Sequence, residues 1–72
     1  MNVERLVAMA NDIAAFFDAE TDKAVAAEGV RSHLSRFWEP RMRRAIIEHV
    51  QKGGAGLTAT ARAGIERLAP VA

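Results

Sequence analysis

The chain has 72 residues, and a chain of this length buries only about 60% of the surface that its unfolded form exposes, so it can form at most one small compact unit. Half of its residues are hydrophobic, but 15 of these are alanine, which favours helix and contributes little buried area. The net charge is only +1 and there is no cysteine, which excludes disulfides, thiolate zinc sites, cysteine-ligated iron–sulfur clusters and a cysteine nucleophile.

The small net charge hides an uneven distribution along the chain. Residues 1–30 carry −4, residues 31–44 carry +4 because they contain five arginines and one glutamate, and the remainder adds +1. The N-terminal segment has charged side chains among its apolar residues and no long apolar run. We therefore expect neither a signal peptide nor a membrane span, and a cytoplasmic location.

The first two predicted helices rest on apolar residues that repeat every three or four positions. The first is expected over about residues 3–18, with Asn2 as its N-cap. The second is expected over about residues 22–38, with Thr21 or Asp22 as its N-cap, so a tight turn joins the two helices.

The third predicted helix covers about residues 40–52. Pro40 suits the first turn of a helix and pushes Glu39 out of the helical region, so Trp38-Glu39-Pro40 is expected to form a corner. Gly53-Gly54 is expected to end this helix with a left-handed cap.

A short last helix is expected over about residues 58–69, capped by Thr58 and closed by Pro70. Its apolar stripe is thin, and it is treated as optional. With no strand pattern and no internal repeat, the sequence predicts a single all-α domain over residues 1–72, a small bundle of three helices plus a short fourth C-terminal helix. The larger apolar residues available to its core, or to a partner, are Leu6, Ile13, Phe17, Val30, Leu34, Phe37, Trp38, Ile46, Val50, Ile65 and Leu68.

No catalytic, cofactor-binding or metal-binding residue is expected. His33 and His49 fall on different predicted helices, and neither has a carboxylate beside it at metal-binding spacing, so both are interpreted as ordinary helix-face side chains. The glycine-rich stretch 53–56 lacks the lysine and hydroxyl of a nucleotide-binding loop, and no triad is placed by the sequence. A chain this small could hardly enclose a substrate pocket, so we expect no catalysis by the chain alone.

The segment 33–44 has the composition of a binding surface, because it contains two aromatic residues, a proline corner and four arginines. Aromatic residues and arginine are enriched at the centres of protein interfaces. The competing interpretation is that Phe37 and Trp38 fill the core while the arginines are solvated, and for Phe37 alone we favour it. The predicted partner-binding residues are His33, Arg36, Phe37, Trp38, Glu39, Pro40, Arg41, Met42, Arg43 and Arg44.

Helices joined by turns together with clustered arginines are also typical of helix-turn-helix proteins that bind DNA. The low net charge and the acidic first helix argue against this, because they would repel phosphate. We therefore expect no nucleic-acid partner, and a small nucleic-acid-binding regulator remains the alternative from another class.

The sequence resembles the small delta subunit of the molybdenum- or tungsten-containing, NAD-dependent formate dehydrogenases of bacteria. The resemblance rests on the opening residues 1–7, on Met9-Ala10-Asn11, Ile13 and Phe16-Phe17, and above all on His33-Leu34 followed by the string Arg36-Phe37-Trp38-Glu39-Pro40-Arg41-Met42-Arg43. The glycine loop 53–54 followed by Leu57 agrees with the family's layout, and the last dozen residues match more loosely.

This resemblance implies a subunit that holds no cofactor and is attached to an enzyme that oxidises formate to carbon dioxide and reduces NAD. In that family the large alpha subunit carries molybdopterin guanine dinucleotide and iron–sulfur clusters, and the beta and gamma subunits carry FMN and further clusters. The delta subunit would bind the large subunit and support assembly or stability of the active enzyme, either permanently or as a transient maturation chaperone. The residues of segment 33–44 themselves suggest how the chain would bind: we expect Trp38 to insert into an apolar pocket of the large subunit while Arg36, Arg41, Arg43 and Arg44 pair with acidic groups around it.

Overall fold

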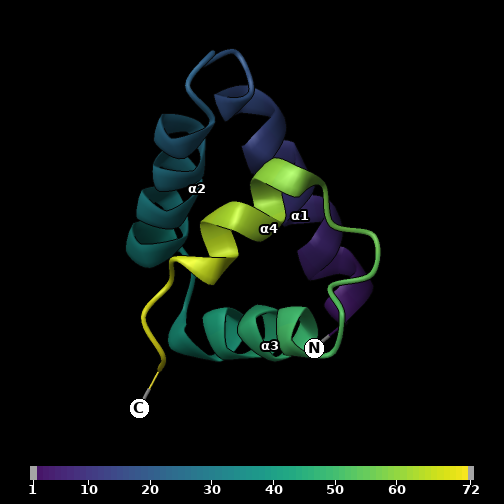
Figure 1. The fold of residues 1–72 in the computed structure, drawn as a ribbon. Coiled ribbons are helices and arrows are strands. Elements are labelled where there is room, and N and C mark those ends of the chain that lie inside the picture. The colour runs from purple at the N-terminus through teal and green to yellow at the C-terminus, as the bar shows by residue number, and fades with distance from the viewer. Residues whose placement is uncertain (1, 72) are drawn as a thin grey trace.

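The computed structural model describes residues 2–71, which form four helices and their connections (Figure 1). The helices are α1 (Val3–Phe17), α2 (Lys23–Phe37), α3 (Pro40–Gln51) and α4 (Ala59–Glu66). Within the described residues there is no strand, and the predicted all-α class is confirmed. The first three helices begin and end within one residue of their expected bounds.

The helices begin where the sequence supplies suitable capping residues. Asn2, Asp22 and Thr58 each accept a hydrogen bond from a backbone N–H in the first turn of α1, α2 and α4, respectively. Such caps satisfy donors that have no partner inside the helix. Pro40 occupies the first turn of α3, where its missing N–H costs no helical hydrogen bond.

The loop between α3 and α4 starts with two glycines in the left-handed region, at φ 115° for Gly53 and 65° for Gly54. The N–H of Gly54 donates to the carbonyl of His49 at 2.9 Å, which closes the end of α3 as predicted. Asn11 of α1 holds the far side of the loop, because its side chain donates to the carbonyl of Gly56 and accepts from the N–H of Thr58, both at 2.9 Å.

The three longer helices lie along the sides of a triangle, and α4 crosses between them (Figure 1). Helix α4 packs against each of the other three, so it is a central element of the fold and not an optional addition. It ends three residues earlier than expected, because the N–H groups of Arg67 and Leu68 bond to carbonyls three residues back and form a tight turn. That turn carries Leu68 into the core.

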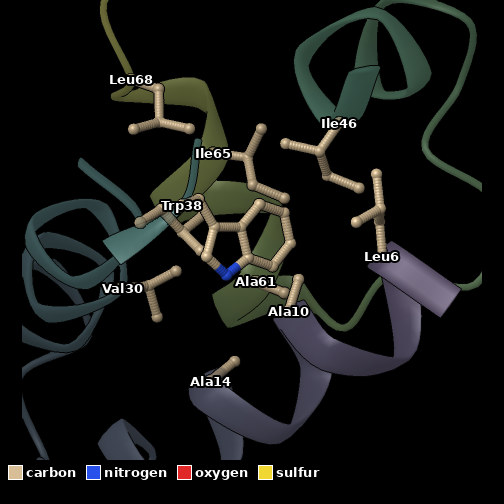
Figure 2. Packing of buried hydrophobic residues seen from close by; sticks show 10 residues of the cluster. Leu6, Ala10, Ala14, Val30, Trp38, Ile46, Ala61, Ile65 and Leu68 are labelled. Atoms are coloured by element: carbon tan, nitrogen blue, oxygen red, sulfur yellow. The ribbon is translucent and has the colours of Figure 1, made fainter. Parts of the chain in front are cut away.

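The core draws on all four helices and on the connections after α2 and α4 (Figure 2). The core contains few large side chains, but α4 and α2 pack very closely. A Cβ on Gly64 of α4 would overlap the side chain of Val30 in α2 and would come within 3.0 Å of the carbonyl oxygen of Ala27. The core cluster consists of Leu6, Ala10, Ala14, Val30, Leu34, Trp38, Ile46, Ala61, Ile65 and Leu68.

Candidate partner-binding surface

The corner between α2 and α3 is built from two extended residues. Trp38 has φ −87° and ψ 137°, and Glu39 has φ −65° and ψ 153°, the conformation that Pro40 imposes on the residue before it. The N–H of Trp38 still donates to the carbonyl of Leu34 at 3.1 Å, and the N–H of Arg43 donates to the carbonyl of Glu39 at 3.0 Å. Both helices are therefore hydrogen-bonded up to the corner, which fixes the direction of the side chains on it.

Trp38 is a core residue, with only 5% of its surface exposed. Its indole points from the end of α2 into the cluster that contains Ala10, Ala61 and Ile65 (Figure 2). Trp38 follows the buried Val30 and Leu34 at four-residue spacing, so its side chain continues the buried stripe of α2 and packs beside α4. The expectation that Trp38 inserts into a partner is therefore wrong for this fold.

Phe37 lies on the outside, with 70% of its surface exposed. The interpretation that placed its ring in the core is wrong as well. Successive residues of a helix point about 100° apart, so when Trp38 fills the core at this level the last residue of α2 is directed away from it. The ring of Phe37 contacts the half-buried His33 one turn earlier, with the ring centroids 4.8 Å apart.

Four of the five arginines in residues 31–44 divide into two groups. Arg31 bonds Glu28, and half-buried Arg43 donates from Nη1 to the carbonyl of Trp38 at 2.5 Å, which places a cation at the C-terminal end of α2. Arg36 and Arg41 are exposed, and within residues 2–71 they make no hydrogen bond or ion pair. The second group has its hydrogen-bonding capacity available for a partner.

We call the exposed part of this corner the corner surface: Arg36, Phe37, Glu39, Pro40 and Arg41. Exposed Arg44 lies one turn further along α3, where it lines an open hollow of about 400 Å³ together with Arg41. Of the remaining predicted residues, His33 borders the corner surface through its contact with Phe37, and Met42 is half-buried against the core. The corner surface thus contains one exposed ring and two exposed arginines, whose guanidinium groups can bind carboxylates in forked geometry.

The Glu28 carboxylate joins α2 to the turn after α4. Its oxygens lie 2.6 Å from Arg31 Nη2 and 3.3 Å from Arg67 Nη1. The hydrogen bond from Arg31 is the main reason that the pKa of Glu28 is lowered from its ordinary value of 4.5. This cluster is a structural tie, and it explains why Arg31 does not belong to the corner surface.

The described residues offer no metal cluster and no membrane span. Between residues 2 and 71, no three His, Asp or Glu side chains are grouped so that they could hold a metal ion. None of the helices in the same range is long and apolar enough to cross a membrane. His49 bonds the carbonyl of Ala55 at 2.8 Å, a contact that helps to fix the loop after α3.

The sequence matches the family described as FdsD, the NADH-dependent formate dehydrogenase delta subunit, over residues 5–65. The chain belongs to this family. No curated protein and no solved structure matches it. The match to the delta-subunit family covers α1 except its first two residues, all of α2 and α3, and α4 except its last residue, so it includes the whole corner surface.

Two exposed apolar side chains of this delta-subunit chain lie outside the set predicted from the sequence. Phe16 has 77% of its surface exposed and Val25 has 52%. A signal for Phe16 was present, because the apolar stripe of the first helix accommodates Phe17 and leaves its neighbour outside the stripe. Val25 offered no comparable signal, since it stands in a run of alanines at the start of α2.

Proposed function

We propose that this chain is a non-catalytic subunit of an NAD-dependent formate dehydrogenase that binds the large alpha subunit through the corner surface and supports assembly or stability of the active enzyme. In this proposal the partner subunits oxidise formate to carbon dioxide and reduce NAD. They also hold the molybdopterin guanine dinucleotide, the iron–sulfur clusters and the FMN, while this chain holds no cofactor. Membership of the delta-subunit family supports the assignment to the complex.

The observation that carries the binding site is the exposure of Phe37 at the corner, where Arg36 and Arg41 are also exposed and have no hydrogen-bond or ion-pair partner among residues 2–71. Burying such a ring is worth about 1.5–3 kcal/mol, and aromatic residues and arginine are the types that dominate binding energy at interfaces. The corner surface therefore suits an apolar pocket with acidic groups at its edge. The rigid corner favours binding, because little conformational freedom is lost when the pocket closes on the ring.

Support of the large subunit follows from mass action. A ligand that binds only the folded form stabilises it, by about 2.7 kcal/mol when its free concentration is 100 times Kd. A subunit that folds around a large cofactor would gain most from such support while the cofactor is being inserted. Removing this chain is thus expected to lower the amount of active enzyme and not its rate per loaded active site.

The test is to tag the chain in its native host, purify it in mild salt, identify the proteins that accompany it by mass spectrometry, and assay formate-dependent NAD reduction. Recovery of an active stoichiometric enzyme would establish a resident subunit. Recovery of an inactive large subunit alone would establish a transient maturation chaperone. Recovery of neither, or a DNA gel shift by the isolated chain at low salt, would contradict the proposal.

A further inference from the structure

A second exposed aromatic residue lies at the opposite end of α2 from the corner surface. Phe16 has 77% of its surface exposed, and its ring stands edge-on to that of Phe17, with centroids 5.1 Å apart. Phe17 is itself fixed, because its ring packs so closely on Gly29 that a Cβ there would overlap it. The ring of Phe16 therefore rests against a closely packed neighbour, although most of its surface faces solvent.

Phe16 continues an apolar stripe along the side of α1. Met9, Ile13 and Phe16 follow one another at i, i+4 and i+7, which places them on one flank of the helix. This flank is distinct from the face that enters the core through Leu6 and Ala10, and Met9 and Ile13 are only partly buried against that core. Anchors at these spacings are those by which a helix binds in an apolar groove.

The charge beside Phe16 is opposite to that of the corner surface, whereas exposed Arg5 lies one turn before Met9 at the other end of the stripe. Asp12 stands one turn before Phe16, is exposed, and makes no ion pair or hydrogen bond within residues 2–71. Glu20 follows the helix and is paired with no base in the same range, although its carboxylate accepts the N–H of Asp22 at 3.2 Å. The acidic groups therefore lie at the C-terminal part of the stripe, where a partner's basic side chains could reach them.

The two surfaces are separated by the length of α2. Phe16 lies where α1 turns into α2, and Phe37 lies at the other end of α2, beside the corner (Figure 1). A helix of 15 residues is about 22 Å long, so no single side-chain pocket can receive both rings. The surface at Phe16 has acidic groups beside its ring, whereas the corner surface has arginines, so the two require binding sites of opposite charge on a partner.

We infer that the stripe Met9, Ile13 and Phe16, which we call the α1 stripe, is a second protein-binding surface that occupies an apolar groove with basic residues at its edge on another part of the formate dehydrogenase complex. Charge complementarity with Asp12 and Glu20 selects a basic edge. The chain would then bridge two sites of opposite charge. The inference rests on the proposed membership of the complex and is independent of the assignment of the corner surface.

The experiment is site-specific photo-cross-linking in the assembled enzyme. The tagged chain, carrying p-benzoylphenylalanine in place of Phe16, is co-expressed with the alpha, beta and gamma subunits, and the cross-linked peptides are identified by mass spectrometry. The same replacement of Phe37 tests the corner surface, and that of Ala8, an exposed residue of α1 outside the stripe, is the control. We expect position 16 to label a subunit segment containing lysine or arginine that position 37 does not label, and position 8 to label nothing.

Each outcome is decisive for one of the two surfaces. A cross-link from position 37 without one from position 16 would overturn the α1 stripe and leave the proposed function standing. A cross-link from position 16 alone would support the α1 stripe and overturn the corner surface. No cross-link from either, or labelling by positions 8 and 16 of the same segment, would overturn the inference.

Affinity measurements give an independent readout. Phe16→Ala is expected to raise Kd for the alpha–beta–gamma assembly at least about tenfold while leaving the chain folded, because the ring is mostly exposed. Asp12→Asn is expected to reduce the dependence of Kd on salt. The matched control is Val25→Ala, which removes an exposed apolar side chain outside both surfaces. An unchanged Kd for Phe16→Ala would overturn the inference.

Discussion

Trp38 and Phe37 are neighbours in the chain, and their side chains lie in opposite environments. The indole is packed among residues of α1, α2 and α4, whereas the phenyl ring faces solvent beside His33. Both residues fitted the helical stripe of α2 in the sequence. The spacing could not decide between them, because Phe37 lies three and Trp38 four residues after the buried Leu34, and the choice depends on how α4 packs against α2.

Replacing the two residues should therefore have different effects on stability. Trp38→Ala should reduce the free energy of unfolding by about 3–5 kcal/mol, a large part of what a chain of this size has, because it leaves a cavity in the core. Phe37→Ala should change it by less than about 0.5 kcal/mol, as for other exposed sites. Urea unfolding followed by circular dichroism measures both. A Trp38→Ala variant as stable as the wild type would contradict this packing, and so would a Phe37→Ala variant that is destabilised as much as Trp38→Ala.

The Glu28 cluster makes stability depend on pH. Because the pKa of Glu28 is lowered from 4.5 in the folded chain, its contribution is complete well above 4.5 and is lost as the pH falls through the lowered value. The melting temperature of the wild type should thus exceed that of Glu28→Gln at pH 7, and the difference should shrink towards pH 3. The difference should be small, since the carboxylate is half exposed. Glu66→Gln, at an exposed site with no ion pair within residues 2–71, is the control, and a gap that widens in acid would contradict the assignment.

The positions of the helices could be predicted from the sequence, but the central packing role of α4 could not. Each predicted helix forms, and Asn2, Asp22 and Thr58 cap three of them, because capping and periodicity act within a few residues. The central place of α4 was not predictable in the same way. Ala61 and Gly64 contribute because they are small enough to allow close packing. A prediction that counts large apolar side chains underrates a helix of this kind.

The loop before α4 should depend on Asn11 more than on its own residues. Asn11→Ala removes both hydrogen bonds to the loop and should cost about 1–2 kcal/mol, with faster hydrogen exchange at the Thr58 amide. Asn11→Asp keeps the acceptor for Thr58 but not the donor to Gly56, so it should retain protection at Thr58. Hydrogen exchange measured by NMR separates the two variants. Equal protection of Thr58 in wild type and Asn11→Ala would show that Asn11 does not hold the loop.

At the scale of the whole molecule, a small core and a divided surface together favour a chain that acts by binding. The core combines small alanines with a few larger side chains, while Phe16 near the end of α1 and Phe37 at the end of α2 remain exposed. The arginines and aromatic residues of the sequence are the reason that the binding surface is proposed in this segment. The sequence did not predict which of these residues face outward, because Arg43 and Trp38 are used by the fold itself.

The most direct test of the central claim is the Kd of the tagged chain for an alpha–beta–gamma formate dehydrogenase assembly prepared without it. Wild type is compared with Phe37→Ala and with the double variant Arg36→Gln/Arg41→Gln, and Val25→Ala is the control. Binding through the corner surface predicts that Phe37→Ala raises Kd by about tenfold or more, that the double variant also weakens the salt dependence of binding, and that Val25→Ala changes neither. A Phe37→Ala variant that binds with the affinity of the wild type would contradict the claim.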